Sequence, residues 1–293
     1  MNTITNMSNK RLSPLPDILP QKQVQEALEE DLGRRGDITS IAVINSEITA
    51  ELQIISREDG VIAGIDLARC AFTMLDPSTL FTAHLKDGDN IKKGQKLATV
   101  SGNAISLLSA ERTALNFLTH LSGIATEVAK IRDLVKDYPV EITCTRKTIP
   151  GLRVLQKYAV RAGGGRNHRM GLDDAILIKD NHIAIAGNIT TAIQQAKAYA
   201  GHLIPIEVEV DTLEQLEMVL NEGVNLVLLD NMEPKILTKA VEMCKNRCLT
   251  EASGGITPES VQAVAATGVN FIAMGWITHS AKSLDIGLDF TTT

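Results

Sequence analysis

The alternation of strand-like and helical runs after residue 139 limits the fold of this chain more than any other feature of its sequence. Six short apolar runs have the composition of strands: 140–145, 175–180, 205–211, 224–231, 248–255 and 269–275. Helical patterns separate them, near 152–163, 188–201, 212–222, 233–246 and 257–267. This alternation predicts parallel pairing through βαβ crossovers. We expect a (β/α) barrel that is incomplete because it has only six strands, with a doubly wound open sheet as the alternative.

The part of the chain before residue 139 has a different pattern. Residues 21–31 predict a short helix, and residues 47–58 and 78–101 alternate apolar and polar side chains with the period of half-buried strands. Residues 106–136 carry apolar side chains at helical spacing and predict one long helix. The length of 293 residues is about twice that of a common domain, so we expect two domains.

The composition of the chain argues against several kinds of binding partner. The formal net charge is −6 and only 3% of the residues are aromatic, which argues against nucleic acid as a partner. Four cysteines are too few for a disulfide scaffold. No apolar run reaches the roughly 18 residues of a membrane span, and the polar N-terminus lacks the apolar core of a signal peptide. We therefore expect a cytoplasmic protein without a membrane partner.

Charged and small polar residues follow the predicted strands at their carboxyl ends, where a parallel barrel places its active site. They are Arg146 and Lys147; Lys179, Asp180 and His182; Glu207, Glu209 and Asp211; Asp230 and Asn231; Glu251 with Ser253, Gly254 and Gly255; and Gly275. A packed core cannot hold so many charges. The sequence therefore predicts an active site at this edge of the sheet.

The charges also segregate by sign. Residues 145–182 hold eight lysines or arginines and only three aspartates, a pattern that favours a small polyanionic substrate. The later carboxylates, such as Glu209 and Asp230, suit Mg²⁺ or ribose hydroxyls, although structural ion pairs with Lys179 are another interpretation. The glycines after the last two strands let backbone N–H groups approach a phosphate.

Seven segments of the chain resemble the quinolinate phosphoribosyltransferase family, in the expected order. The longest is TRKTIPGLRVLQKYAVRAGGGRNHRMGLDDAILIKDNHI over 145–183. The others are EDLGRRGDITS (30–40), ERTALNFLTHLSGIAT (111–126), EVEVD (207–211), LLDNM (228–232), EASGGI (251–256) and GWITHSAKSLDIGLDF (275–290). The similarity spans roughly residues 20–290, and the longest run is its most specific part.

This resemblance implies an α/β protein with an N-terminal α/β sandwich domain plus an incomplete (β/α) barrel domain. We expect an N-terminal arm over 1–20, a sandwich over 21–125 joined by 280–293, and a barrel over 126–279. It also implies a pentosyltransferase of de novo NAD biosynthesis. Quinolinate and 5-phosphoribosyl-1-diphosphate, with Mg²⁺, would give nicotinate mononucleotide, diphosphate and CO₂. The family forms homodimers in which each site is completed by the partner subunit.

The resemblance implies roles for individual residues as well. Arg146, His168, Arg169 and Lys179 would line the quinolinate carboxylates, with Thr145 in the same substrate-binding segment. Arg112 would reach in from the other protomer.

The remaining roles concern the phosphoribosyl half of the reaction. Lys147 would face the diphosphate, and Glu209 and Asp230 would hold the ribose hydroxyls and Mg²⁺. The 5-phosphate would lie against two loops: Ser253, Gly254 and Gly255, and Met274, Gly275 and Trp276. The residues expected to act in catalysis are Lys147, Lys179, Glu209 and Asp230. Trp276 departs from the small residue more common in the family, so its bulk would either narrow the phosphate loop or pack beside it.

Three other functions remain open at this point. The first is that of a related group, associated with molybdate transport genes, that shares the fold. The second is a barrel aldolase in which Lys179 forms a Schiff base. The third is a binding or regulatory protein without catalysis. The presence of both the cationic and the acidic residues favours the quinolinate reaction.

Overall fold

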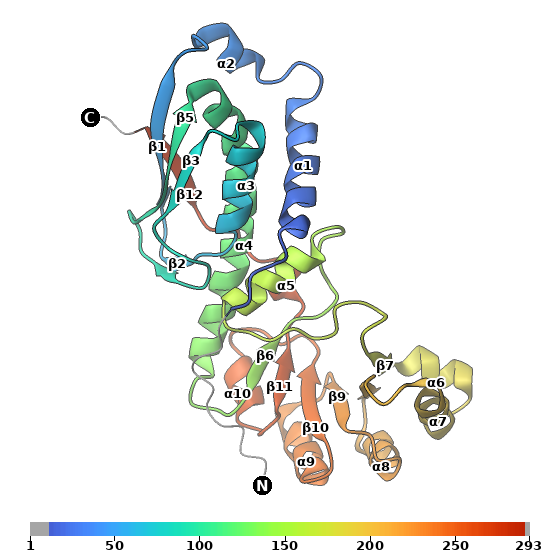
Figure 1. Cartoon of the computed structure of the whole chain (residues 1–293). Helices are drawn as coiled ribbons and strands as arrows, with labels where there is room; N and C mark the ends of the chain where they lie inside the picture. The colour runs from blue at the N-terminus through green and yellow to red at the C-terminus, as the bar shows by residue number, and fades with distance from the viewer. Residues whose placement is uncertain (1–11, 291–293) are drawn as a thin grey trace. The chain divides into compact units, whose positions relative to one another are not determined.

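The computed structural model describes residues 12–290 and divides into two compact units, which we describe separately (Figure 1). Residues 1–11, most of the expected N-terminal arm, lie outside the described residues. The first helix, α1, begins at Ile18, within the segment expected to be an arm.

The barrel unit comprises Lys130–Val154 and Gly165–His279. Its six parallel strands lie in the order β6–β11–β10–β9–β8–β7. They are β6 (Glu141–Thr143), β7 (Ile176–Ile178), β8 (Ile206–Val210), β9 (Leu226–Asp230), β10 (Leu249–Ser253) and β11 (Phe271–Ala273). All six predicted strands are confirmed. In the described part of the chain β6 and β7 do not pair with each other, so the barrel is incomplete.

Six helices belong to this unit. They are α6 (Asp180–Ala186), α7 (Ile189–Tyr199), α8 (Leu213–Asn221), α9 (Pro234–Cys244), α10 (Val261–Ala265) and α11 (Trp276–His279). Helix α6 corresponds to none of the helices predicted from the sequence. The helix predicted over 257–267 is shorter than expected, because residues 257–260 form a turn in which the Thr257 N–H donates to Ser260 Oγ at 3.0 Å.

The two faces of the barrel strands differ in chemistry. Side chains alternate along a strand, so Glu207 and Glu209 share one face of β8 while Val208 and Val210 lie on the other. These two valines are at most 1% exposed, and β8 contacts α8. The apolar face is thus covered by helices, and the carboxylates point to the opposite, inner face.

The N-terminal unit comprises residues 12–129, Leu155–Gly164 and 280–290. Its four-stranded antiparallel sheet has the order β12–β1–β5–β3. The strands are β1 (Thr49–Ser56), β3 (Leu80–Ala83), β5 (Lys96–Asn103) and β12 (Ile286–Phe290), and a small sheet pairs β2 (Gly60–Val61) with β4 (Asn90–Ile91).

The helices of this unit are α1 (Ile18–Leu32), α2 (Ile38–Val43), α3 (Ile65–Leu75), the long α4 (Ala104–Leu134) and most of α5 (Arg153–Ala162). Helix α3 contacts β3 of the sheet, and α1 packs against α3. The predicted long helix is therefore confirmed. Its residues Leu107, Leu118 and Ile124 are completely buried, as the helical spacing of apolar side chains requires. Between residues 12 and 290, no helix combines the length and apolar character needed to cross a bilayer.

Candidate active site

The carboxyl ends of the barrel strands bring most of the predicted site residues to one edge of the sheet. Thr145, Arg146 and Lys147 follow β6, and Lys179 follows β7. Glu209 lies in β8, Asp230 ends β9, and Ser253 ends β10; Met274, Gly275 and Trp276 follow β11. This common placement comes from parallel pairing, in which all strand ends meet at one edge.

Lys179 and Glu209 form an ion pair between neighbouring strands, the Lys179 Nζ donating to Glu209 Oε2. The side chain of Glu209 is 13% exposed and that of Lys179 42%. The ion pair holds the Lys179 Nζ, the atom that a Schiff base would use, against a carboxylate. The aldolase alternative therefore finds no support in this geometry.

Asp230 lies among charged groups of both signs. Burial raises the pKa of Asp230, and the negative charge of Asp211 raises it further. The positive charges of Lys179 and Lys147 oppose this shift, as does a hydrogen bond from Asn231 Nδ2 to Asp230 Oδ2 at 2.7 Å. The two lysines and two aspartates thus interact at the ends of β6, β7, β8 and β9.

A second cationic group is formed by Arg146 and Arg169. Burial lowers the pKa of the Arg169 guanidinium, and the positive charge of Arg146 lowers it further, against the opposing charges of Asp174 and Glu207. The Nε of Arg146 is buried and has no hydrogen-bond partner among the described residues. Two guanidiniums close enough to repel each other favour an anion bound beside them.

His168 reaches the inner face from a loop rather than from a strand. The chain at Arg166 runs beside β6, with the Arg166 N–H donating to Ile142 O at 2.8 Å and a parallel bridge to Thr143. This pairing uses the free edge of β6 in the incomplete barrel. It places His168 where its Nε2 lies 2.8 Å from Glu207 Oε2 on β8.

Gly254 makes the loop after β10 possible. It has φ +104°, and a Cβ there would lie 2.7 Å from the backbone nitrogen of Asn231 and closer still to its side chain. Asn231 itself adopts φ +53°, and its N–H donates to Ser253 O at 2.9 Å. The loops after β9 and β10 therefore pack directly against each other. Only glycine fits at position 254, where the two loops touch.

The loop after β11 lies against the residues that follow β6. A Cβ at Gly275 would lie 3.0 Å from Lys147 Cδ and 3.2 Å from Thr145 Oγ1. The Thr278 hydroxyl donates to Lys147 O at 2.8 Å. Trp276 packs beside the neighbouring loop, with its indole N–H donating to Ile256 O at 3.1 Å. This hydrogen bond shows that the indole contacts the loop after β10; its effect on phosphate binding stays a prediction.

Arg112 lies in α4 and belongs to the N-terminal unit, whereas the other predicted site residues belong to the barrel unit. Its side chain is 66% exposed, and its guanidinium lies 3.8 Å from Glu111. Three strand-end charges that were predicted to lie at this edge, but were given no individual role, also belong to the site. Asp211 acts electrostatically on Asp230, and Glu207 and Glu251 approach His168. The strand period predicted the inner-facing position of Glu207 but not its contact with His168, which comes from a loop.

Comparison with known proteins matches both units of the chain to one family. The model of the quinolinate phosphoribosyl transferase C-terminal domain matches residues 124–289, and that of the N-terminal domain matches residues 37–122. The chain belongs to the quinolinate phosphoribosyltransferase family. This confirms the resemblance found in the seven sequence segments.

Individual members of the family agree over nearly their whole length. The probable nicotinate-nucleotide pyrophosphorylase [carboxylating] of Bacillus subtilis is 45% identical, covering 89% of this chain and 90% of that protein. The corresponding protein of Mycobacterium leprae is 44% identical over 91% of this chain and 95% of its own. The nicotinate-nucleotide pyrophosphorylase structure from Francisella tularensis superposes with a TM-score of 0.92 at 37% identity, covering 97% of this chain and all of that one. The expected pair of an α/β N-terminal domain and an incomplete α/β barrel is thus confirmed.

Proposed function

We propose that this quinolinate phosphoribosyltransferase family member transfers the phosphoribosyl group of 5-phosphoribosyl-1-diphosphate to quinolinate, giving nicotinate mononucleotide, diphosphate and CO₂. The observation that carries this proposal is the division of charge at one barrel edge. Arg146 and Arg169 form a cationic group with a buried, unpartnered Nε on Arg146, while Glu209 and Asp230 supply carboxylates from β8 and β9. A diacid and a developing sugar cation need these two kinds of group.

The cationic group suits the two carboxylates of quinolinate. Each charge-assisted hydrogen bond contributes about 1.5–3 kcal/mol net, and Arg146, His168, Arg169 and Lys179 provide several. Arginine also matches a carboxylate with two parallel N–H groups, which fixes the ring plane. These residues would orient the pyridine nitrogen toward C1 of the ribose.

The carboxylates suit the sugar. When the C1–O bond to diphosphate breaks, the electron pair leaves with diphosphate and C1 becomes oxocarbenium-like. Glu209 and Asp230 would stabilise this positive charge and accept hydrogen bonds from the ribose hydroxyls. After the ring nitrogen bonds to C1, the pyridinium accepts the electron pair released when the 2-carboxylate leaves as CO₂, and a proton then adds to C2.

The donors at this edge also fit Mg²⁺. Asp230 is partly buried and repelled by Asp211, so a nearby cation would relieve both unfavourable effects on its charged form. Glu209 and Asp230 would hold the ion, together with water and diphosphate oxygens. When bound, Mg²⁺ would neutralise charge on the departing diphosphate. Lys147 would contact the diphosphate on the same side, and Ser253–Gly255 with Met274–Trp276 would surround the 5-phosphate.

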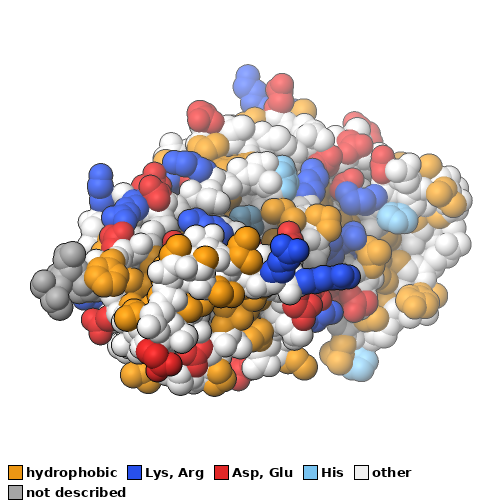
Figure 2. Space-filling model, turned by 90° about the horizontal axis from the view of Figure 1, so that it is seen from above, with side chains coloured by type: hydrophobic (Ala, Val, Ile, Leu, Met, Phe, Trp, Pro, Cys, Tyr) orange, Lys and Arg blue, Asp and Glu red, His pale blue; other side chains and the backbone are white. Residues whose placement is uncertain are grey.

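We further propose a homodimer in which Arg112 completes the site of the partner subunit. Arg112 is largely exposed on its own chain. The N-terminal unit also exposes apolar side chains on α2, where Ile38, Ile41 and Val43 are 61%, 59% and 74% exposed. Figure 2 shows hydrophobic side chains gathered on the surface seen from above, the side on which α2 lies in Figure 1. Such a patch is typical of an interface between protein subunits. The cytoplasmic location stays a prediction.

The proposed reaction is tested by incubating the purified protein with quinolinate, 5-phosphoribosyl-1-diphosphate and Mg²⁺. We expect nicotinate mononucleotide by mass spectrometry and one CO₂ per product. Replacing quinolinate with nicotinate tests whether the second carboxylate is required. Absence of product from the quinolinate mixture would contradict the proposal.

The shared site is tested by mixing two variants with strongly reduced activity, Arg112→Ala and Lys179→Ala, at a subsaturating quinolinate concentration. A heterodimer would contain one intact site, so an equal mixture that exchanges subunits should recover about a quarter of wild-type activity. No recovery after confirmed subunit exchange would contradict the role of Arg112. A monomer in light scattering would contradict the dimer.

A further inference from the structure

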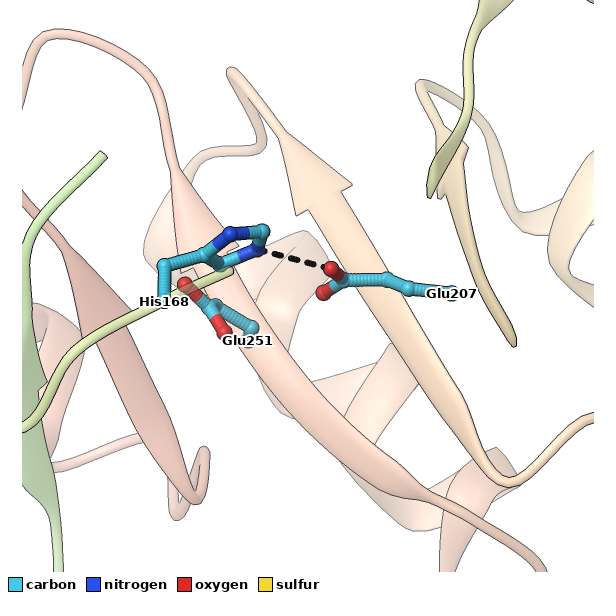
Figure 3. Close-up of side chains that lie close together, drawn as sticks. All are labelled: His168, Glu207 and Glu251. Carbon is cyan, nitrogen blue, oxygen red and sulfur yellow. Dashed lines mark hydrogen bonds and ion pairs between the residues drawn. The ribbon is translucent and has the colours of Figure 1, made fainter. Parts of the chain in front are cut away.

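Three side chains meet on the inner face of the barrel: His168, Glu207 and Glu251 (Figure 3). His168 Nε2 lies 2.8 Å from Glu207 Oε2, and one ligand atom of each of the three residues lies within 4.8 Å of the others. They come from the loop beside β6, from β8 and from β10. The sequence separates the first from the last by 83 residues, so only the barrel brings them together.

Both glutamates are buried, which makes their charges costly unless they are balanced. Glu207 is 5% exposed and Glu251 is 3% exposed. Glu251 accepts a hydrogen bond from Thr143 Oγ1 at 2.8 Å. Glu207 has one oxygen against His168, and its Oε1 is buried without a hydrogen-bond partner among the described residues. For Glu207, hydrogen bonds from neutral groups therefore do not balance the negative charge.

The charged groups around His168 have both signs. Glu207 on β8 and Glu251 on β10 lie close to the ring. Arg169, the next residue in the chain, is cationic, and its charge interacts with those of Glu207 and Arg146. The charged group in direct contact with the ring, at 2.8 Å, is the carboxylate of Glu207. An opposite charge in contact with a histidine favours its charged form.

We propose that Glu207 and Glu251 are positioning residues that hold His168 as an imidazolium in a fixed orientation, so that its charge binds a quinolinate carboxylate. The inference rests on the proposed function, because quinolinate is the ligand it explains. Neither glutamate touches the substrate in this account; both act through His168. The charged ring would add a third positive charge beside those of Arg146 and Arg169.

A histidine with two carboxylates could instead hold a divalent metal ion. The 2.8 Å contact between His168 and Glu207 has the length of a direct hydrogen bond between the two side chains. The structure therefore favours a proton between them. A stoichiometric metal ion that is retained by wild-type protein and lost from Glu207→Gln would overturn the inference, and elemental analysis after dialysis detects it.

The kinetic test compares Glu207→Gln and Glu251→Gln with wild type. Glu217→Gln, an exposed glutamate on α8, is the control. Activity of the wild type with quinolinate is established first, so failure of the proposed function is seen separately. The two KM values are then measured independently, for quinolinate and for 5-phosphoribosyl-1-diphosphate. We expect Glu207→Gln to raise the quinolinate KM by about tenfold and to leave the other KM unchanged.

The pH profile provides the readout that a purely structural role would not change. If binding needs the imidazolium, kcat/KM for quinolinate falls as the pH rises and the ring loses its proton. Removing the charge of Glu207 makes that proton easier to lose, so the falling limb should move to lower pH by about one unit. Glu251→Gln should move it in the same direction by less. An unmoved limb in folded Glu207→Gln, or an equal change in both KM values, would overturn the inference.

A measurement on the wild type covers the case in which the variants do not fold. In protein labelled with ¹⁵N at histidine, both ring nitrogens of an imidazolium carry protons and have similar chemical shifts. We expect this signature for His168 at neutral pH without substrate, assigned by comparison with His168→Gln. The shifts of a neutral tautomer would overturn the inference, whether or not the protein turns over quinolinate.

Discussion

Lys179 and Glu209 are joined by an ion pair that links the end of β7 to β8. The pair lies where the cationic segment of the chain meets its acidic one. It therefore connects the two halves of the proposed chemistry, in which cations hold the diacid and carboxylates face the sugar. Lys179 also acts beyond this pair, because its positive charge opposes the rise in the pKa of Asp230.

Lys179→Ala should lower kcat/KM for quinolinate by about 10- to 100-fold, because it removes one charge-assisted contact and leaves Glu209 without its cation. Steady-state kinetics with 5-phosphoribosyl-1-diphosphate saturating would measure the loss. Lys239→Ala, on an exposed position of α9, is the matched control and should behave as wild type. Unchanged kinetics for Lys179→Ala would remove this residue from the site.

Asp230→Asn should reduce kcat by about 100-fold or more, because a neutral amide no longer stabilises positive charge at C1 of the ribose. The quinolinate KM should change little, since the cationic group remains. Single-turnover rates separate this effect from product release. Asp137→Asn, an exposed change in the same unit, serves as the control. A loss confined to KM would argue against a role in the chemical step.

Gly254 and Gly255 form a matched pair of positive-φ glycines. Gly254→Ala places a Cβ against Asn231, whereas nothing lies within 4 Å of a Cβ at Gly255. Both substitutions incur the roughly 1–2 kcal/mol cost of the left-handed region, but only the first must displace the loop. We expect the KM for 5-phosphoribosyl-1-diphosphate to rise several-fold more in Gly254→Ala. Equal effects of the two variants would contradict this account.

His120 on α4 should make the stability of the fold depend on pH. Burial lowers the pKa of this imidazole below its ordinary value of 6.5, and its Nε2 lies 2.9 Å from Gln156 Nε2. The folded state therefore favours the neutral ring. Its contribution to stability is present above pH 6.5 and is lost as the pH falls through the folded-state value.

His120→Gln should accordingly flatten the decline in unfolding free energy on acidification, by at most about 1.4 kcal/mol per pH unit. Denaturant titrations at several acidic pH values measure this slope. His84→Gln, an exposed change in the same unit, should keep the wild-type slope. The prediction is wrong if His120→Gln and wild type lose stability in parallel.

Periodicity in the sequence predicted the regular elements well. Every predicted barrel strand is present, and the long helix over 106–136 corresponds to α4 at Ala104–Leu134. Local signals were weaker at element ends. The helical pattern near 257–267 corresponds to α10, which begins only at Val261, because the Thr257 N–H first donates to Ser260 Oγ in a turn. The seven-residue α6 has too few turns for an apolar period to be visible.

Pairings between distant segments could not be predicted from such patterns. β12 pairs with β1, joining Phe290 to Leu52, although more than 200 residues separate them in the chain. The Lys179–Glu209 contact was foreseeable, since adjacent parallel strands end side by side. The approach of His168 to Glu207 was not, because His168 comes from a loop beside the free edge of β6.

The sequence by itself determined the strand and helix periods, the sign of charge at each strand end and the family, because these depend on residue type and short-range spacing. The tertiary structure alone decided which side chains meet when they do not end neighbouring strands. It brought two buried glutamates against His168, packed Trp276 beside the loop after β10 and fitted Gly254 against Asn231. Contacts of this kind depend on barrel curvature and strand register, which arise only when distant segments pack together.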